Sequence, residues 1–448
     1  MKKILIFSLV FLWLFPVAFG QSGSFSEYQY TCKDGVARPY IIYSSKKTAE
    51  QEKAPLLIYL HGAISNKSLK KDPLAYIKKS KLLSLADKGA YHLLFCYGQK
   101  GATWFDTVGM DMVIGEMEEV IQKLNIDEQK VFLSGFSDGA SGVLYFAMVH
   151  PAPFAGFIAM NGHLKVANNL GHTDLFPANM NGKALYIINT QSDVLYPLHQ
   201  VRPTITYLKQ YNPNITFKTP EGNHEMSYLE AETASLIAFI KKNQRMPLKK
   251  ISWESSDPSS SAIDWLSIVQ IDSLSKESKD WHQPYQLQVF NDKADFGLKY
   301  DYSYPGPGLK VSGFKNDTCT AKRMGIQKDD LLMMMEQDSM SSPYSPYYYV
   351  AKKRAGDSTS LTVQRADQTL EFKGVFNPGH YYEVFEQQQA SAKLFAYRKG
   401  KKLVVTTSKV AAFRIDFDEM GGKEVREMEV NGEGYESSFR GVEVIKTE

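Results

Sequence analysis

The stretch Lys130-Val-Phe-Leu-Ser-Gly-Phe-Ser-Asp-Gly-Ala140 decides the fold. A short run of apolar and β-branched residues leads into Gly135-x-Ser137-x-Gly139, and a segment with helical periodicity follows to about residue 150. A strand that turns sharply on one serine into a helix is the arrangement called a nucleophile elbow. The small residues around the serine let the backbone close on itself, and the helix N-terminus favours negative charge near the hydroxyl. Ser137 is therefore the candidate nucleophile.

Two later loops supply the groups that such a serine needs, a base and an acid that orients the base. Asp193 stands in Gln191-Ser-Asp-Val, directly after the buried-strand pattern of residues 184–190. His224 stands in Pro220-Glu-Gly-Asn-His, after a second strand pattern at residues 215–219. The carboxyl ends of parallel strands gather at one edge of a sheet, where active sites form. The order serine, acid, histidine is also the order found in hydrolases built on such sheets.

Other residues compete for these two roles. His163 follows the strand pattern of residues 157–160 and is the strongest rival to His224. Only one strand separates it from the elbow, which is too early for the base. Asp174 is the rival acid, but it lies in a polar loop with no strand leading into it. His92 and His150 fit structural roles in a strand and at a helix end.

The segment Ala54-Pro-Leu-Leu-Ile-Tyr-Leu-His-Gly-Ala63 is a strand pattern that ends in His-Gly. This is the place where such folds take one amide of the oxyanion hole, so the backbone N–H groups of Ala63 and Asp138 are the candidate donors. Trp104, ahead of a helix pattern, is a candidate substrate-binding residue, and a buried structural tryptophan is the alternative.

These motifs together resemble a known family. Residues from about 53 to 253 resemble the α/β-hydrolase esterases related to polyhydroxybutyrate depolymerases and feruloyl esterases, through YLHG, KVFLSGFSDGA, the QSD loop and the GNH loop. The resemblance implies an α/β-hydrolase doubly wound sheet and hydrolysis of a small-molecule or polymer-linked carboxylic ester by Ser137, Asp193 and His224. It departs where Ala-Ile-Ser-Asn follows His-Gly, since many relatives carry a Gly-rich run there. A secreted serine peptidase of the same fold, or a binding protein with an inactive hydrolase fold, stays as the alternative.

Composition excludes several other functions. The 448 residues carry a net charge of +3 with no basic stripe, so we expect no nucleic-acid partner. No zinc-ligand spacing, phosphate-binding loop or dinucleotide fingerprint is present, and we expect no metal and no cofactor. Of the three cysteines, Cys96 lies in a strand pattern and is predicted to be buried, whereas a Cys32–Cys319 bridge is permitted if the chain is exported.

The first twenty residues have the pattern of a secretory signal peptide. Lys2 and Lys3 precede the apolar run Ile4–Phe19, and small residues stand before Gln21. We expect cleavage after Gly20, a secreted or periplasmic enzyme and no membrane span thereafter. A transmembrane anchor is the alternative, although 16 apolar residues (4 to 19) are fewer than a full span needs.

The chain changes character after the Ser-rich residues 254–261, where strands and Gly or Pro turns begin to dominate. We predict an α/β-hydrolase catalytic domain at 21–245, a C-terminal β module at 246–292 and 377–448, and a PDZ-like domain at 293–376 that interrupts the module. The PDZ resemblance rests on Phe296-Gly-Leu and on a Gly325 turn into Leu331–Met335, with Asp329 where such domains usually carry glycine. It implies a groove for a peptide C-terminus, and a groove that only packs internally is the alternative. The methionines of Leu331–Met335 are predicted to fill the core.

Overall fold

The computed structural model describes residues 23–64, 72–258, 262–274, 278–421 and 425–447. The predicted signal peptide, residues 1–20, lies outside the described residues. Among the described helices, none has the length and apolar character needed to cross a membrane.

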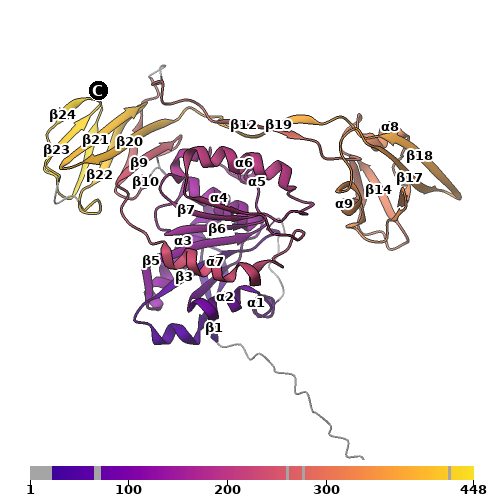
Figure 1. The fold of residues 1–448 in the computed structure, drawn as a ribbon, viewed down its shortest axis with the longest axis horizontal. Coiled ribbons are helices and arrows are strands. Elements are labelled where there is room, and N and C mark those ends of the chain that lie inside the picture. The colour runs from indigo at the N-terminus through magenta and orange to yellow at the C-terminus, as the bar shows by residue number, and fades with distance from the viewer. Residues whose placement is uncertain (1–22, 65–71, 259–261, 275–277, 422–424, 448) are drawn as a thin grey trace, which may run out of the picture.

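The centre of the molecule is an eight-stranded sheet in the order β1-β2-β4-β3-β5-β6-β7-β8 (Figure 1). β1 and β2 are antiparallel to each other, β2 is antiparallel to β4, and every later pair is parallel. The strands are β1 (Gly23–Thr31), β2 (Ala37–Ser45), β3 (Ala54–Leu60), β4 (His92–Cys96), β5 (Ile126–Phe136), β6 (Gly156–Met160), β7 (Ala184–Ile188) and β8 (Ile215–Lys218).

Helices cover both faces of this sheet, because its central strands are apolar on both sides. Leu56, Ile58 and Leu60 of β3 belong to the core on one face, and Leu57 and Tyr59 belong to the core on the other. This alternation within one strand follows from the pleat of the backbone. The first face is covered by α3 (Thr107–Lys123), α4 (Asp138–Val149) and α6 (Leu198–Tyr211), and the second by α2 (Leu82–Gly89) and α7 (Leu229–Lys242). The shorter helices are η1 (Lys46–Glu50), α1 (Pro73–Ile77), α5 (Leu164–Leu170) and η2 (Pro177–Met180).

A second body consists of two sheets that share one apolar core. The first has the order β24-β23-β21-β20-β9 and the second the order β10-β11-β22-β25. Strands from before and after residues 293–376 therefore pack together. The strands are β9 (Lys250–Ser255), β10 (Ala262–Ile263), β11 (Leu266–Ile271), β20 (Ala392–Lys399), β21 (Lys402–Ser408), β22 (Val410–Asp416), β23 (Glu427–Val430), β24 (Glu433–Tyr435) and β25 (Val442–Lys446).

The structure differs from the predicted β module in one element. β12 (Gln286–Asn291) and β19 (His380–Glu386) form a separate two-stranded sheet, here called the ribbon. The ribbon lies along α5 and α6 (Figure 1), and Val289 and Phe385 belong to the apolar core of the central sheet. Val289, Val384 and Phe385 of the ribbon are buried against the α/β-hydrolase part, whereas Phe290 and Tyr381 are exposed.

Residues 293–376, here called the insert, lie at the far end of the ribbon (Figure 1). Their sheet has the order β13-β14-β15-β17-β18, with β16 paired to β15, and their apolar core is separate from the other two. Leu332 and Met335 are buried in this core, whereas Met333 and Met334 are only half-buried. The elements are β13 (Leu298–Asp301), β14 (Leu309–Phe314), α8 (Thr320–Met324), β15 (Leu331–Met335), β16 (Asp338–Ser339), α9 (Ser345–Val350), β17 (Ser358–Arg365) and β18 (Gln368–Val375).

The position that departs from the PDZ pattern has an unusual backbone. Asp329 has φ 72°, in the left-handed region that favours glycine, and its neighbour Asp330 pairs with Arg365 at 2.7 Å. The resemblance of the insert to PDZ domains stays a prediction.

The permitted disulfide is not formed. Cys32, Cys96 and Cys319 are all free and buried. Cys32 lies in the core of the central sheet, whereas Cys319 precedes α8 in the insert, so the fold separates the two thiols. Cys96 is buried at the end of β4, as its strand pattern predicts.

Candidate active site

Ser137 lies at the turn between β5 and α4, with φ 59° and ψ −121°. The turn depends on close backbone approach at both flanking glycines. A Cβ on Gly135 would come within 2.4 Å of the Gly139 backbone, and a Cβ on Gly139 within 1.9 Å of the Leu60 carbonyl oxygen. The sequence pattern around the serine is thus a steric requirement of the turn, which exposes Oγ above the edge of the sheet.

The structure brings the three predicted side chains together. The Ser137 Oγ lies 2.8 Å from Nε2 of His224, and Nδ1 of His224 lies 2.8 Å from Oδ2 of Asp193. Asp193 belongs to the loop between β7 and α6 (residues 189–197, the acid loop). His224 belongs to the loop between β8 and α7 (residues 219–228, the histidine loop). An ionised carboxylate only accepts hydrogen bonds, so Nδ1 carries the proton and Nε2 is left to accept the serine proton.

Asp193 is held in its ionised form inside the protein. Its side chain is fully buried, and burial raises the pKa of the carboxyl. The hydrogen bonds from His224, from the backbone N–H of Tyr196 and from Asn161 outweigh this effect, so the pKa of Asp193 lies below its usual value. A charged, oriented acid is what fixes the tautomer of the histidine.

Three side chains around this group were not predicted from the sequence. Asn161 donates to Asp193 at 2.8 Å and accepts from the Tyr228 hydroxyl at 2.9 Å. Tyr196 places its ring edge-on to His224, with centroids 5.3 Å apart, and its hydroxyl 3.3 Å from Asp138. The available signals were the Asn-Gly pair directly after β6 and a tyrosine three residues beyond the candidate acid.

Within the described part of the chain, neither rival residue has a hydrogen bond to the Ser137 side chain. His163 is buried at the start of α5, where its Nδ1 accepts the Lys165 N–H at 3.0 Å. Burial lowers the pKa of His163 to about 4. Asp174 accepts the backbone N–H groups of Gln388 and Gln389 at 3.2 Å and 2.8 Å.

The turn after β3 lies against the nucleophile. A Cβ on Gly62 would come within 2.8 Å of the Ser137 Cβ, and Ala63 has φ 58°. Asp138 connects the two segments, because its carboxylate accepts the Ile64 N–H at 3.3 Å. The N–H of Asp138 is at the first position of α4, where no carbonyl of the same helix can pair with it. Both candidate oxyanion donors therefore belong to segments that meet at Ser137.

Trp104 does not have the environment of the substrate-binding residue that the sequence suggested. Its side chain is fully buried, and Nε1 donates to the His61 carbonyl oxygen at 2.9 Å. It therefore supports the turn after β3 rather than lining an open pocket, which is the structural alternative that the sequence left open.

Residues 45–244 match a family model described as Phospholipase/Carboxylesterase. This part of the chain has the α/β-hydrolase fold. The match supports an esterase-type hydrolase, and the sheet order with Ser137 between β5 and α4 agrees with it. No curated protein matches the chain.

Solved structures resemble the α/β-hydrolase part at low identity. One is the fluorophosphonate-binding serine hydrolase F of Staphylococcus aureus, at 16% identity and a TM-score of 0.39, covering 49% of this chain and 98% of that one. The Pyrococcus furiosus esterase Pf2001 is 16% identical with a TM-score of 0.39, and the match covers 50% of this chain and 94% of that one. A ferulic acid esterase is 13% identical with a TM-score of 0.40, and the match covers 49% of this chain and 99% of that one. Likeness at this level carries no inference about the substrate.

Proposed function

We propose that this protein is a serine hydrolase that cleaves carboxylic esters. The observation that carries the proposal is the continuous hydrogen-bonded series from Ser137 Oγ through His224 to Asp193, with both distances at 2.8 Å. The match of residues 45–244 to a carboxylesterase family supports the same reaction. The signal-peptide pattern of residues 1–20 adds the proposal that the enzyme is exported.

The proposed reaction begins when Nε2 of His224 takes the Ser137 proton as Oγ attacks the ester carbonyl carbon. The amides of Ala63 and Asp138 hold the resulting oxyanion. The tetrahedral intermediate then collapses, the bond to the alcohol oxygen breaks, and His224 gives its proton to that oxygen. Water, deprotonated by His224, attacks the acyl-enzyme in the same way and releases the acid and the free serine.

Labelling with a fluorophosphonate, followed by mass spectrometry, tests the proposal. We expect a covalent adduct on Ser137 and loss of p-nitrophenyl acetate hydrolysis in Ser137→Ala by roughly 10⁴- to 10⁶-fold in kcat. Ser235→Ala, at an exposed position of α7, is the control and keeps wild-type turnover. Activity of Ser137→Ala within tenfold of wild type would reject the proposed nucleophile. Hydrolysis of p-nitroacetanilide as fast as the ester would favour a peptidase instead.

A further inference from the structure

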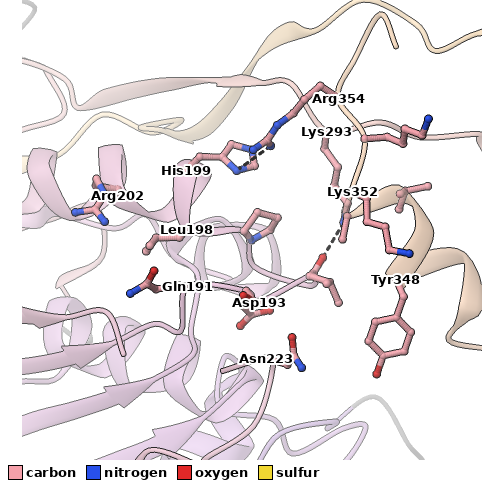
Figure 2. Close-up of a pocket in the computed structure, with 16 residues that line it drawn as sticks. Gln191, Asp193, Leu198, His199, Arg202, Asn223, Lys293, Tyr348, Lys352 and Arg354 are labelled. Carbon is pink, nitrogen blue, oxygen red and sulfur yellow. Dashed lines mark hydrogen bonds between the residues drawn. The ribbon is translucent and has the colours of Figure 1, made fainter. Parts of the chain in front are cut away.

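A cleft of about 570 Å³ lies between the α/β-hydrolase part and the insert. Asp193 and Asn223 lie on one side of it and Tyr348 and Lys352 on the other (Figure 2). The size falls in the range of small-molecule sites. Because Asn223 directly precedes His224, the cleft begins at the loops that carry two of the proposed catalytic residues.

More cationic than acidic side chains line the cleft. Its only lining carboxylate among the described residues is Asp193, which is buried and already accepts hydrogen bonds from His224 and Asn161. Five cationic side chains line it, from α6, from the start of the insert and from the connection between α9 and β17: Arg202, Lys293, Lys352, Lys353 and Arg354.

Three of these cations have acidic partners within the protein. Lys352 pairs with Asp338 at 2.8 Å, Lys353 with Glu336 at 2.6 Å, and Arg354 lies 3.5 Å from Asp292. These ion pairs fix three of the cations at the edge of the cleft. The other two have no such partner.

Lys293 and Arg202 are those two, since no carboxylate of the described residues lies within 4.0 Å of either. The Lys293 ammonium donates to the Val194 carbonyl oxygen in the acid loop, at 2.9 Å. The Lys293 side chain is half-buried, and burial lowers the pKa of its ammonium, whereas the nearby charges of Asp295 and Asp193 act to raise it. The Arg202 guanidinium has one ring contact, 5.9 Å from the centroid of Phe217. An anion bound beside either cation would give that cation a charge-assisted partner.

The position of the cleft indicates which part of an ester enters it. His224 must give a proton to the leaving alcohol oxygen, so the alcohol part leaves Ser137 on the side of His224. Asn223 and Asp193 lie on that side, and both line the cleft. The acyl part stays bonded to Ser137 during the second half of the reaction.

We propose that this cleft binds an anionic group, a carboxylate or a phosphate, carried on the alcohol part of the ester. The inference rests on the proposed function and adds a substrate class to it. Arg202 and Lys293 are the specificity-determining residues, and the insert contributes to the site through Lys293.

Two acetyl esters that differ in one charge test this. 4-Acetoxybenzoate has an anionic leaving group, and methyl 4-acetoxybenzoate is its neutral counterpart with the same acyl group. We expect wild type to have the lower KM for the anionic ester, and Arg202→Gln and Lys293→Met each to lower the anionic-to-neutral preference in kcat/KM about tenfold. Lys209→Gln, on the same helix as Arg202, keeps the wild-type preference. Arg202→Lys restores part of it.

Three outcomes would overturn the inference. The first is a wild-type enzyme that is labelled at Ser137 but has the same KM for both esters. The second is an equal loss for both esters in Arg202→Gln. The third is inhibition or activation by inorganic phosphate that depends on Arg202 while the anionic ester has no advantage, which would assign the cleft to a free anion. Absence of labelling and of turnover for both esters would instead reject the proposed function.

Discussion

Ser137 has a backbone conformation that non-glycine residues rarely adopt. Such a conformation costs on the order of 1–3 kcal/mol and persists only where the surroundings determine it. Here the Ser137 N–H donates to the Met160 carbonyl oxygen at 3.0 Å, and its own carbonyl oxygen accepts the Ser141 N–H at 3.0 Å. These bonds keep Oγ directed toward His224, and the glycines at 135 and 139 make the turn sterically possible.

The two competing histidines give a test at this scale. We expect His224→Ala to lower kcat for p-nitrophenyl acetate nearly as much as Ser137→Ala, because members of a triad act as a unit. The measurement is steady-state hydrolysis of both variants beside wild type.

His163→Ala is the matched variant in the loop after β6. Its imidazole contacts the Lys165 N–H and the ring of Tyr196, and among the described residues it has no hydrogen bond to Ser137. We expect His163→Ala to lower the free energy of unfolding while kcat for p-nitrophenyl acetate stays near the wild-type value. The reverse ranking of the two histidines would move the proposed base to His163.

The residues of the candidate site were predictable from sequence only where a strand leads directly into them. Ser137, Asp193 and His224 each follow an apolar strand pattern, and parallel strands bring such positions to one edge. Asn161 also follows a strand, β6, but no motif assigns a role to an asparagine at that position, and Tyr228 stands at the end of the histidine loop with no strand leading into it. Polar partners of this kind have no local pattern.

At the scale of elements, α3 carries an uncommon buried acid. Glu116 is fully buried on the face of α3 toward the sheet, and both carboxyl oxygens lack a hydrogen-bond partner in the described part of the chain. Burial raises the pKa of Glu116 well above its usual value, and the nearby thiol of Cys96 offsets only part of that shift. The carboxyl therefore keeps its proton to higher pH in the folded protein than in the unfolded chain.

This burial predicts a pH-dependent stability. The unfolded carboxyl ionises near pH 4.5, the ordinary value, whereas the folded one keeps its proton to much higher pH. The stability that this group contributes is therefore greatest below pH 4.5 and falls as pH rises toward the folded pKa, by up to about 1.4 kcal/mol per pH unit. We expect urea unfolding of wild type and Glu116→Gln at about pH 5, 6, 7 and 8 to show the gap widening in favour of the variant. A constant gap would contradict the prediction.

The elements themselves were predictable where their patterns are local. The predicted strand at residues 54–60 has the observed bounds of β3, and the strand patterns at residues 184–190 and 215–219 correspond to β7 and β8. The ribbon was not predictable as a separate sheet. Its partners Asn291 and His380 lie on either side of the insert, so no hairpin turn marks their pairing. Its packing on α5 and α6 is decided by tertiary contact.

At the scale of the whole molecule, the ribbon determines where the insert lies. It extends from the two-sheet body over the helices of the α/β-hydrolase part (Figure 1), and the residues that follow its first strand reach the acid loop. Gln200 of α6 donates to Asn291 at 2.6 Å, and Lys293 reaches the Val194 carbonyl oxygen. The insert therefore contacts the acid loop through Lys293 and lines one side of the cleft, while its own apolar core is separate.

This arrangement predicts that the insert can be removed without loss of the chemistry. Asn291 and His380 are paired in the ribbon, so an Asn-Gly turn replacing residues 292–379 would close it as a hairpin. We expect the shortened protein to be folded by circular dichroism and to hydrolyse p-nitrophenyl acetate, because Ser137, Asp193 and His224 all lie outside the deleted residues. The preference for 4-acetoxybenzoate over its methyl ester should fall, since four of the five cations of the cleft are deleted. A folded but inert deletion variant would show that the insert completes the active site, and the contact between Lys293 and Val194 would then be the first to restore.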